Sequence, residues 1–183
     1  MIFALYQFTT MPLKIFLSIA IALHVSFVIA QEEISDKERK HFLSGTFSYG
    51  IVPAGSAEDN ITDGHLVPAI GFDYLYRVAS KWEVGIVADY ELATYVIPRK
   101  ENLKRERAFI VSALTAYNIF PTWSAFAGVG IELEKHKNFA IIRLGTEYSI
   151  ALKNRWVIPI GIFVDFKEGY ESYSVGAGIG RSF

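Results

Sequence analysis

The last twelve residues of the chain, Ser172-Tyr-Ser-Val-Gly-Ala-Gly-Ile-Gly-Arg-Ser-Phe183, alternate between two kinds of residue. One set of alternate positions is mostly apolar and ends in an aromatic ring; the other is small or polar, almost entirely glycine and serine. A period of two predicts a β-strand with two unlike faces. The glycine and serine face has almost no bulk, as expected for a face that looks into a crowded interior. This pattern is typical of the closing strand of a small membrane barrel.

The first 30 residues have the composition of a secretory signal peptide. Lys14 precedes an apolar run over 15–29, and Val28-Ile29-Ala30 supplies the small-residue pattern of a cleavage site. The run is shorter than the roughly 20 residues that a spanning helix needs, so an uncleaved anchor is the weaker interpretation. We therefore expect a signal peptide at 1–30, a charged periplasmic leader at 31–40 and one barrel domain at 41–183.

Composition excludes several classes of site. The chain has no cysteine, which removes disulfides, thiolate metal sites and lipid attachment through cysteine. Its 18 Lys and Arg residues nearly balance its 19 Asp and Glu residues, so no overall field indicates a nucleic acid partner.

Eight strand-like segments follow the leader, most of them with a clear period of two. Each is long enough to cross a bilayer, because a tilted transmembrane strand needs about 9–11 residues. The fourth is ambiguous, since it is apolar on both faces, with Ile110 and Leu114 on one of them. The sequence predicts an all-β fold, an eight-stranded antiparallel up-and-down transmembrane barrel. The segments are residues 41–52, 65–77, 82–92, 108–119, 123–134, 139–150, 156–166 and 172–183.

The connections alternate between short turns and mostly longer polar loops such as 53–64 and 94–107. All three tryptophans come directly after the short turns, and a tyrosine lies shortly before each of the same turns. Amphipathic rings at one level of a barrel mark a membrane boundary. The predicted aromatic girdle is Tyr76, Trp82, Tyr117, Trp123, Tyr148 and Trp156.

The less apolar face decides which side points outward. It holds eight acids and one clearly basic residue in mid-strand, Arg143, among many glycines and serines. An eight-stranded barrel has an interior just wide enough for side chains, so this face fits the lumen better than the three tryptophans do. Buried charges must pair, and we expect an interior ion network of Glu132, Glu134, Arg143 and Glu147. The alternative is a soluble, lipocalin-like barrel with the apolar face inside.

These features together resemble the small eight-stranded bacterial outer-membrane barrels, such as the transmembrane domain of outer membrane protein A and the outer membrane protein X group. The resemblance implies a porin-like protein of the Gram-negative cell envelope, located in the cell outer membrane. It also implies that the last strand is an assembly signal read by the barrel-assembly machinery. Arg181 departs from that signal, in which an apolar residue or Tyr is usual two places from the end. The signal residues are Tyr173, Val175, Ala177, Ile179 and Phe183.

The second long loop, 94–107, is strongly basic. Clustered Arg and Lys at headgroup level would bind phosphate, and the nearest phosphates in an outer membrane belong to lipopolysaccharide. The candidate lipopolysaccharide contacts are Arg99, Lys100, Lys104, Arg105 and Arg107. A solvated loop without a partner is the alternative.

Catalysis has little support in the sequence. The chain after residue 30 holds three histidines, His41, His65 and His136, and none stands in a His-x-Ser motif. We expect no catalytic residues, cofactor or metal, although lipid A-modifying barrels make His65 the residue to test first. The sequence thus predicts a monomeric barrel, not an enzyme, with a structural or surface-interaction role and outer-membrane lipid and lipopolysaccharide as partners. A soluble periplasmic or secreted barrel binding a hydrophobic ligand is the second hypothesis, and a lipid A-modifying enzyme is the third.

Overall fold

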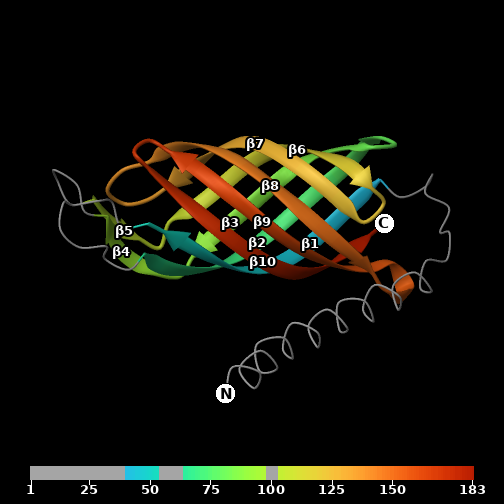
Figure 1. Ribbon diagram of the computed structural model, residues 1–183, viewed down its shortest axis with the longest axis horizontal. Coiled ribbons are helices and arrows are strands. Elements are labelled where there is room, and N and C mark those ends of the chain that lie inside the picture. The colour runs from blue at the N-terminus through green and yellow to red at the C-terminus, as the bar shows by residue number, and fades with distance from the viewer. Residues whose placement is uncertain (1–39, 54–63, 98–102) are drawn as a thin grey trace, which may run out of the picture. The chain divides into compact units, whose positions relative to one another are not determined.

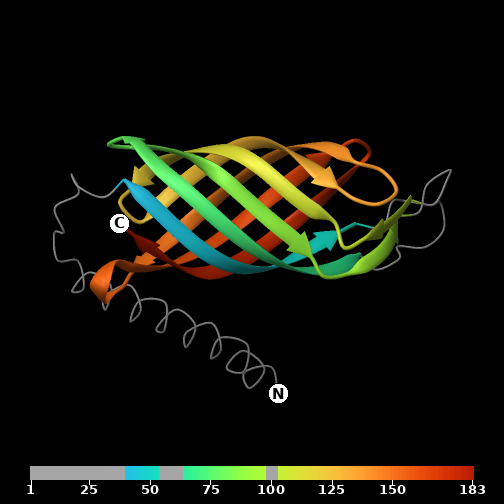
Figure 2. The ribbon, with the colours of Figure 1, turned by 180° about the vertical axis from the view of Figure 1, so that it is seen from behind.

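The computed structural model describes residues 40–53, 64–97 and 103–183. Eight strands form a closed antiparallel barrel in the order β1-β10-β9-β8-β7-β6-β3-β2, which confirms the predicted architecture (Figures 1 and 2). All eight predicted segments are strands, and their ends agree within two residues. No helix in these ranges is long and apolar enough to cross a membrane. The barrel strands are β1 His41–Val52, β2 His65–Ala79, β3 Trp82–Glu91, β6 Phe109–Phe120, β7 Trp123–Leu133, β8 Phe139–Ala151, β9 Trp156–Lys167 and β10 Tyr170–Ser182.

Two elements lie outside the barrel wall. The hairpin of β4 (Thr94–Ile97) and β5 (Leu103–Glu106) lies between β3 and β6, where the sequence predicted only a loop. A short 3-10 turn, η1 (Lys153–Arg155), connects β8 to β9. We call the end of the barrel that carries β4 and β5 the hairpin end, and the end where His41 and Phe183 lie the terminus end (Figure 1).

The barrel closes where β1 pairs with β10, and small residues face each other along this seam. Ser44 and Ser48 lie opposite Gly180 and Gly176. A Cβ atom at Gly178 would lie 2.5 Å from the Gly45 carbonyl oxygen and 2.7 Å from the Thr46 side chain, so this position requires glycine. The closing strand therefore needs its small face to let the two strands approach.

Backbone hydrogen bonds join His41 to Phe183 in both directions, at 3.1 and 2.9 Å. The two rings also stack with centroids 5.5 Å apart, and the His41 Nδ1 atom lies 2.8 Å from the Tyr74 hydroxyl. The terminal aromatic residue is thus fixed to the first residue of the barrel. The other residues of the predicted assembly signal, Tyr173, Val175, Ala177 and Ile179, point outward and are exposed.

The large apolar side chains lie on the outside of the barrel. Val84, Ile131, Ile160 and Val175 are all exposed, whereas the interior holds glycine, serine and charged residues together with a smaller set of apolar side chains. The ambiguous fourth segment, β6, turns Ile110 and Leu114 into the lumen and Phe109 and Tyr117 outward. A closed barrel with an apolar outer wall suits a hydrocarbon environment. Every strand edge is paired, so no backbone group of an edge is left without a hydrogen bond, and the apolar surface meets lipid. The inside-out arrangement of a lipocalin is not the one that this chain adopts.

Aromatic rings gather at the terminus end, beside the short turns. The rings of Trp82 and Tyr117 lie 4.9 Å apart, and those of Trp123 and Tyr148 lie 6.4 Å apart. The Trp156 ring has the Arg181 guanidinium over it at 5.9 Å. Tyr76 contacts His41 at 5.1 Å. This contact of Arg181 gives its charge an aromatic partner at the membrane boundary, where the apolar pattern of the last strand is interrupted.

A charge placed in the middle of the outer wall tests the orientation of the strands. Val129 lies near the centre of β7 and is 64% exposed. Val129→Arg should lower the free energy of unfolding in phospholipid vesicles by about 2–4 kcal/mol, the cost of a cation at the bilayer midplane. Ser80→Arg, in the turn between β2 and β3, is the matched control and should have much less effect. Equal losses in urea unfolding of the two variants would contradict an outer wall in contact with lipid.

Candidate functional site

The β4–β5 hairpin covers the lumen at the hairpin end. Alternate residues of the hairpin point inward, so that Tyr95, Ile97 and Arg105 are buried while Val96 and Lys104 are exposed. Tyr95 and Ile97 form an apolar cluster with Val52 of β1 and Val67 of β2. This cluster fixes the hairpin to β1 and β2, the two strands that follow β3 in the barrel wall.

Contacts on two sides hold the hairpin in place. On the β2 side, His65 Nε2 lies 2.8 Å from the Val96 carbonyl oxygen, and its ring is 5.7 Å from that of Tyr95. On the β7–β8 side, the Arg105 guanidinium pairs with Glu132 and donates to the Lys137 carbonyl oxygen at 2.5 Å. His65 therefore packs against the hairpin and hydrogen-bonds to it, at the hairpin end of the barrel.

Arg105 is fully buried, and its charge is compensated by a compact group of side chains. Besides Glu132, it donates to Glu134 at 3.3 Å, and its guanidinium lies 4.8 Å from the Phe139 ring centre. This corrects the prediction that Arg105 contacts lipopolysaccharide. Inward alternation along β5 directs this side chain into the lumen, where no headgroup phosphate can reach it.

Lys167 of β9 belongs to the same charge cluster as Arg105, at the hairpin end of the lumen. Its ammonium lies 2.6 Å from Glu132 and 3.8 Å from Glu91. The Tyr170 hydroxyl lies 2.8 Å from both Glu132 carboxylate oxygens, and the Tyr95 hydroxyl donates to Glu91 at 3.1 Å. Two cations, Arg105 and Lys167, are thus shared by three carboxylates, Glu91, Glu132 and Glu134, at the hairpin end.

Arg143 forms a second ion cluster deeper in the lumen, with partners that differ from those predicted. It binds Asp165 through two hydrogen bonds of 2.7 and 2.8 Å and binds Asp89 at 2.7 Å. Its guanidinium also lies 4.3 Å from the Phe163 ring centre.

The register explains this correction. Arg143 lies directly across from Asp165 in the β8–β9 ladder. Glu147 lies four positions further along β8, and Glu132 lies four positions beyond Gly128, the partner of Arg143 in β7. Four residues of strand span about 13 Å, which is too far for the Arg143 side chain to pair with Glu147 or Glu132. Glu132 and Glu134 bind Arg105 instead.

The terminus half of the lumen has an excess of acids. Glu83 pairs with Arg77 at 3.0 Å and accepts a 3.4 Å hydrogen bond from Asn118. Asp73 accepts a hydrogen bond from Ser44 at 2.9 Å, and Glu147 accepts one from Ser149 at 3.1 Å. Serine hydroxyl groups therefore donate the hydrogen bonds that Asp73 and Glu147 accept in this half of the barrel.

The lumen has almost no free volume below the hairpin. The cavity there is about 20 Å³, enough for about one water molecule. It is lined by residues of both ion clusters, including Arg143, Asp89, Glu91 and Asp165. At this level of the lumen, the described charged side chains leave room for about one water molecule.

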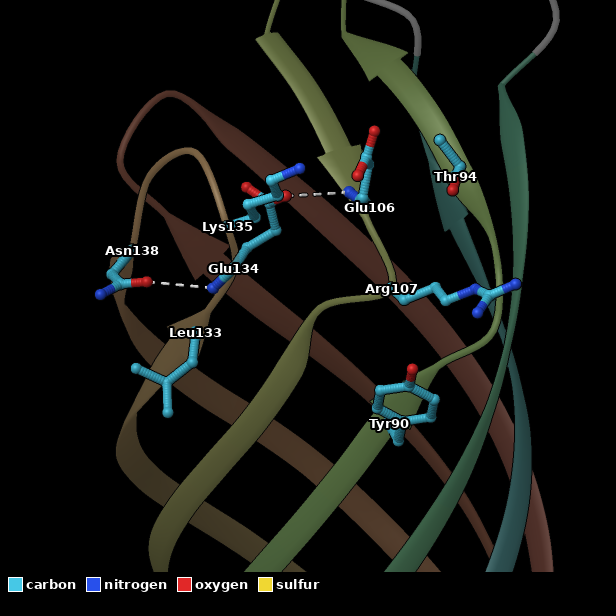
Figure 3. Close-up of a pocket in the computed structure, with 8 residues that line it drawn as sticks. All are labelled: Tyr90, Thr94, Glu106, Arg107, Leu133, Glu134, Lys135 and Asn138. Atoms are coloured by element: carbon cyan, nitrogen blue, oxygen red, sulfur yellow. Dashed lines mark hydrogen bonds between the residues drawn. The ribbon is translucent and has the colours of Figure 1, made fainter.

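The outer surface of the hairpin end carries a broad groove of about 780 Å³ (Figure 3). Of the predicted lipopolysaccharide contacts, Arg107 lines this groove, Lys104 is exposed and paired with Glu106, and Arg99 and Lys100 lie outside the described residues. Lys135 and Asn138 come from the β7–β8 turn. The lining residues are Tyr90, Thr94, Glu106, Arg107, Leu133, Glu134, Lys135 and Asn138.

Glu134 connects the groove to the interior. Its carboxylate accepts hydrogen bonds from the backbone N–H groups of His136 at 2.8 Å and Lys137 at 3.4 Å, in addition to that from Arg105. Burial alone would raise the pKa of Glu134, but these hydrogen bonds to the ionised form outweigh it and hold the pKa below the usual value of 4.5. A hydrogen bond from Lys104 likewise lowers the pKa of Glu106.

The described residues contain no assembled catalytic or metal-binding group. The contacts of the three described histidines are structural: His41 lies beside the Tyr74 hydroxyl, His65 beside the Val96 carbonyl oxygen, and His136 lies 4.0 Å from Glu106. Nor does any set of three or more His, Asp or Glu residues within 40–53, 64–97 and 103–183 have a metal-binding arrangement.

Solved structures share this fold. The chain matches the crystal structure of Ail, the attachment invasion locus protein of Yersinia pestis, in complex with the heparin analogue sucrose octasulfate; the TM-score is 0.52 and the identity 14% over 80% of this chain and 99% of Ail. It also matches the N-terminal β-barrel domain of Pseudomonas aeruginosa OprF, with a TM-score of 0.55 and 10% identity over 80% of this chain and 100% of that domain. No family model and no curated protein sequence matches the chain. The fold is therefore that of small eight-stranded outer-membrane barrels.

Two adjacent residues of β5 allow a test of the buried cluster. Arg105→Gln leaves Glu132 without one of its two cations, and removing one partner of a buried ion pair costs about 3–5 kcal/mol. Because Lys167 remains, we expect a loss near the lower limit, together with faster hydrogen exchange over 94–106. Lys104→Gln removes the same charge from the outer face and should change neither measurement appreciably. Similar behaviour of the two variants would refute the role assigned to Arg105.

The ionisation of Glu134 should be visible in the amides that bind it. Its lowered pKa means that its stabilising contribution is present above pH 4.5 and is lost as the pH falls through the lower folded-state value. In NMR spectra of the refolded protein, the His136 and Lys137 amide shifts should titrate with a midpoint below 4.5. Glu134→Gln should abolish this titration. A midpoint at or above 4.5 would show that these hydrogen bonds do not favour the carboxylate.

Proposed function

We propose that this protein is an integral, non-conducting barrel of the Gram-negative outer membrane with a structural or surface-interaction role. The observation that supports this most directly is the combination of an apolar outer wall with ion clusters in the hairpin half of the lumen. An apolar wall needs lipid, and a filled lumen transports nothing. The hairpin end would face the cell exterior, since the aromatic-rich short turns and both ends of the barrel lie at the opposite end.

The parts of the chain before the barrel fit the same location. We propose that residues 1–30 act as a cleaved signal peptide and 31–40 as a periplasmic leader. The last strand, with Phe183 fixed against His41, would be the segment that the barrel-assembly machinery reads. We further propose a monomer without enzymatic activity.

Lipopolysaccharide is the partner that we propose for the exposed end. Arg107 is the predicted contact that is both described and exposed without a carboxylate within ion-pair distance. The Ail structure contains a polysulfated sugar analogue, which shows that this fold can present a surface to a polyanion. A soluble barrel binding a hydrophobic ligand has less support, because the described lumen is charged and full.

Fractionation and conductance measurements test this proposal together. The protein should stay with membranes after carbonate washing and migrate faster on a denaturing gel before boiling than after it. In planar bilayers it should give no stable conductance steps, with an open porin as the positive control. Release by carbonate would contradict the membrane location, and steady conductance would contradict the closed lumen.

A further inference from the structure

The groove in Figure 3 lies on the lipid side of the barrel wall, not in the lumen. Tyr90 and Leu133, which line its lower part, are exposed residues near the ends of β3 and β7. Phe109 pairs with both Tyr90 and Leu133 in the sheet, and Ile131 lies two residues before Leu133 on the same face of β7; both are exposed apolar residues of the outer wall. The groove therefore continues the surface that meets hydrocarbon, and a ligand would enter it from the membrane.

A local break in strand alternation turns a cation into this groove. Arg107 has a backbone φ of 48°, in the left-handed region that side chains other than glycine rarely adopt. As a result Glu106 and Arg107 are consecutive residues outside the buried positions, between buried Arg105 and buried Ala108. The backbone accepts an uncommon conformation at the point where a guanidinium reaches the outer surface.

The acids of the groove already have ion-pair or hydrogen-bond partners, whereas its two cations form no ion pair among the described residues, although Lys135 attracts Glu106 at longer range. Glu106 pairs with Lys104, and Glu134 is occupied by Arg105 and three backbone N–H groups, including that of Glu106 at 3.3 Å. Neither Arg107 nor Lys135 has a carboxylate within ion-pair distance among the described residues. The groove thus presents two available cations above an apolar floor.

The two cations are separated in space. Figure 3 shows the Arg107 side chain extending toward Thr94, while the Lys135 side chain lies beside Glu106 on the other side of the groove. Two anionic groups on one molecule can each meet one cation, and an acyl chain of the same molecule can cover Tyr90 and Leu133.

We propose that this groove binds a lipid carrying two phosphates, with Arg107 and Lys135 each contacting one phosphate and Tyr90 and Leu133 contacting an acyl chain. The proposal rests on the membrane location proposed above and makes it specific, since it selects a bisphosphorylated glycolipid of the outer leaflet over a phospholipid with one phosphate. Arg suits phosphate because its planar fork donates two hydrogen bonds, and Lys acts as a point charge.

Binding of defined lipids to the refolded protein tests the site. Native mass spectrometry from detergent micelles would measure dissociation constants for bisphosphorylated lipid A, monophosphorylated lipid A and phosphatidylglycerol. The bisphosphorylated form should bind most tightly, by about fivefold for the second phosphate, the effect of one cation near an anionic lipid. Arg107→Gln combined with Lys135→Gln should weaken its binding about 25-fold and remove the preference.

Matched variants keep the outcome interpretable. Lys153→Gln combined with Arg155→Gln removes the same charge from exposed residues at the terminus end and should leave binding unchanged. Leu133→Ser should weaken all three lipids alike. Heat-dependent gel migration confirms that each variant is folded. Equal affinity for the two lipid A forms, an equal loss in the control pair, or no binding by a protein that is folded and membrane-inserted would overturn the groove assignment while leaving the barrel proposal intact.

Discussion

The narrow interior of an eight-stranded barrel is the constraint on which the rest of this structure depends. Such a lumen admits side chains and little else, so any charge placed in it must find a partner within a few ångströms. Acids of β3, β7 and β9 lie there, and they form ion pairs with three long cationic side chains, Arg105, Arg143 and Lys167. The filled tube leaves the outer wall as the surface that meets lipid and the hairpin end as the part available for partners.

The ion clusters around Arg105 and Arg143 join different parts of the structure. Arg143 connects barrel strands that are already hydrogen-bonded into one sheet, and its bidentate contact with Asp165 spans a single ladder. Arg105 connects a separate two-stranded hairpin to the wall, so its pairing with Glu132 determines whether the barrel is covered. Buried ion pairs contribute little net stability compared with apolar packing but strongly disfavour arrangements that leave one charge alone. The Arg105 cluster therefore acts mainly to select one position for the hairpin, with Tyr95 and Ile97 supplying apolar contact.

The sequence was sufficient for the barrel and insufficient for the hairpin, for physical reasons. Period-two alternation depends on local residues, so all eight strands and their lipid-facing sides could be predicted. Ion-pair partners depend on the stagger between strands, which alternation does not determine, and Arg143 was therefore assigned to the wrong carboxylates. The segment 94–107 was interpreted as a charged loop because of its bases, although Tyr95, Ile97, Leu103 and Arg105 share one side of a hairpin. Lys167 was likewise not assigned to the interior network, although it lies two residues after Asp165 on the same face of β9.

The interior charges also determine the shape of the outer surface. Glu134 accepts hydrogen bonds from Arg105 inside the barrel and from the Glu106, His136 and Lys137 backbone at its rim. One carboxylate thus fixes the hairpin to the β7–β8 turn, and these are the two segments that supply Arg107 and Lys135 to the groove. Because Glu134 is occupied by these donors, it does not neutralise the exposed cations beside it. Arg105 therefore has two effects. It pairs with carboxylates inside the hairpin end of the lumen, and by binding Glu134 it leaves the cations of the groove available to an anionic headgroup.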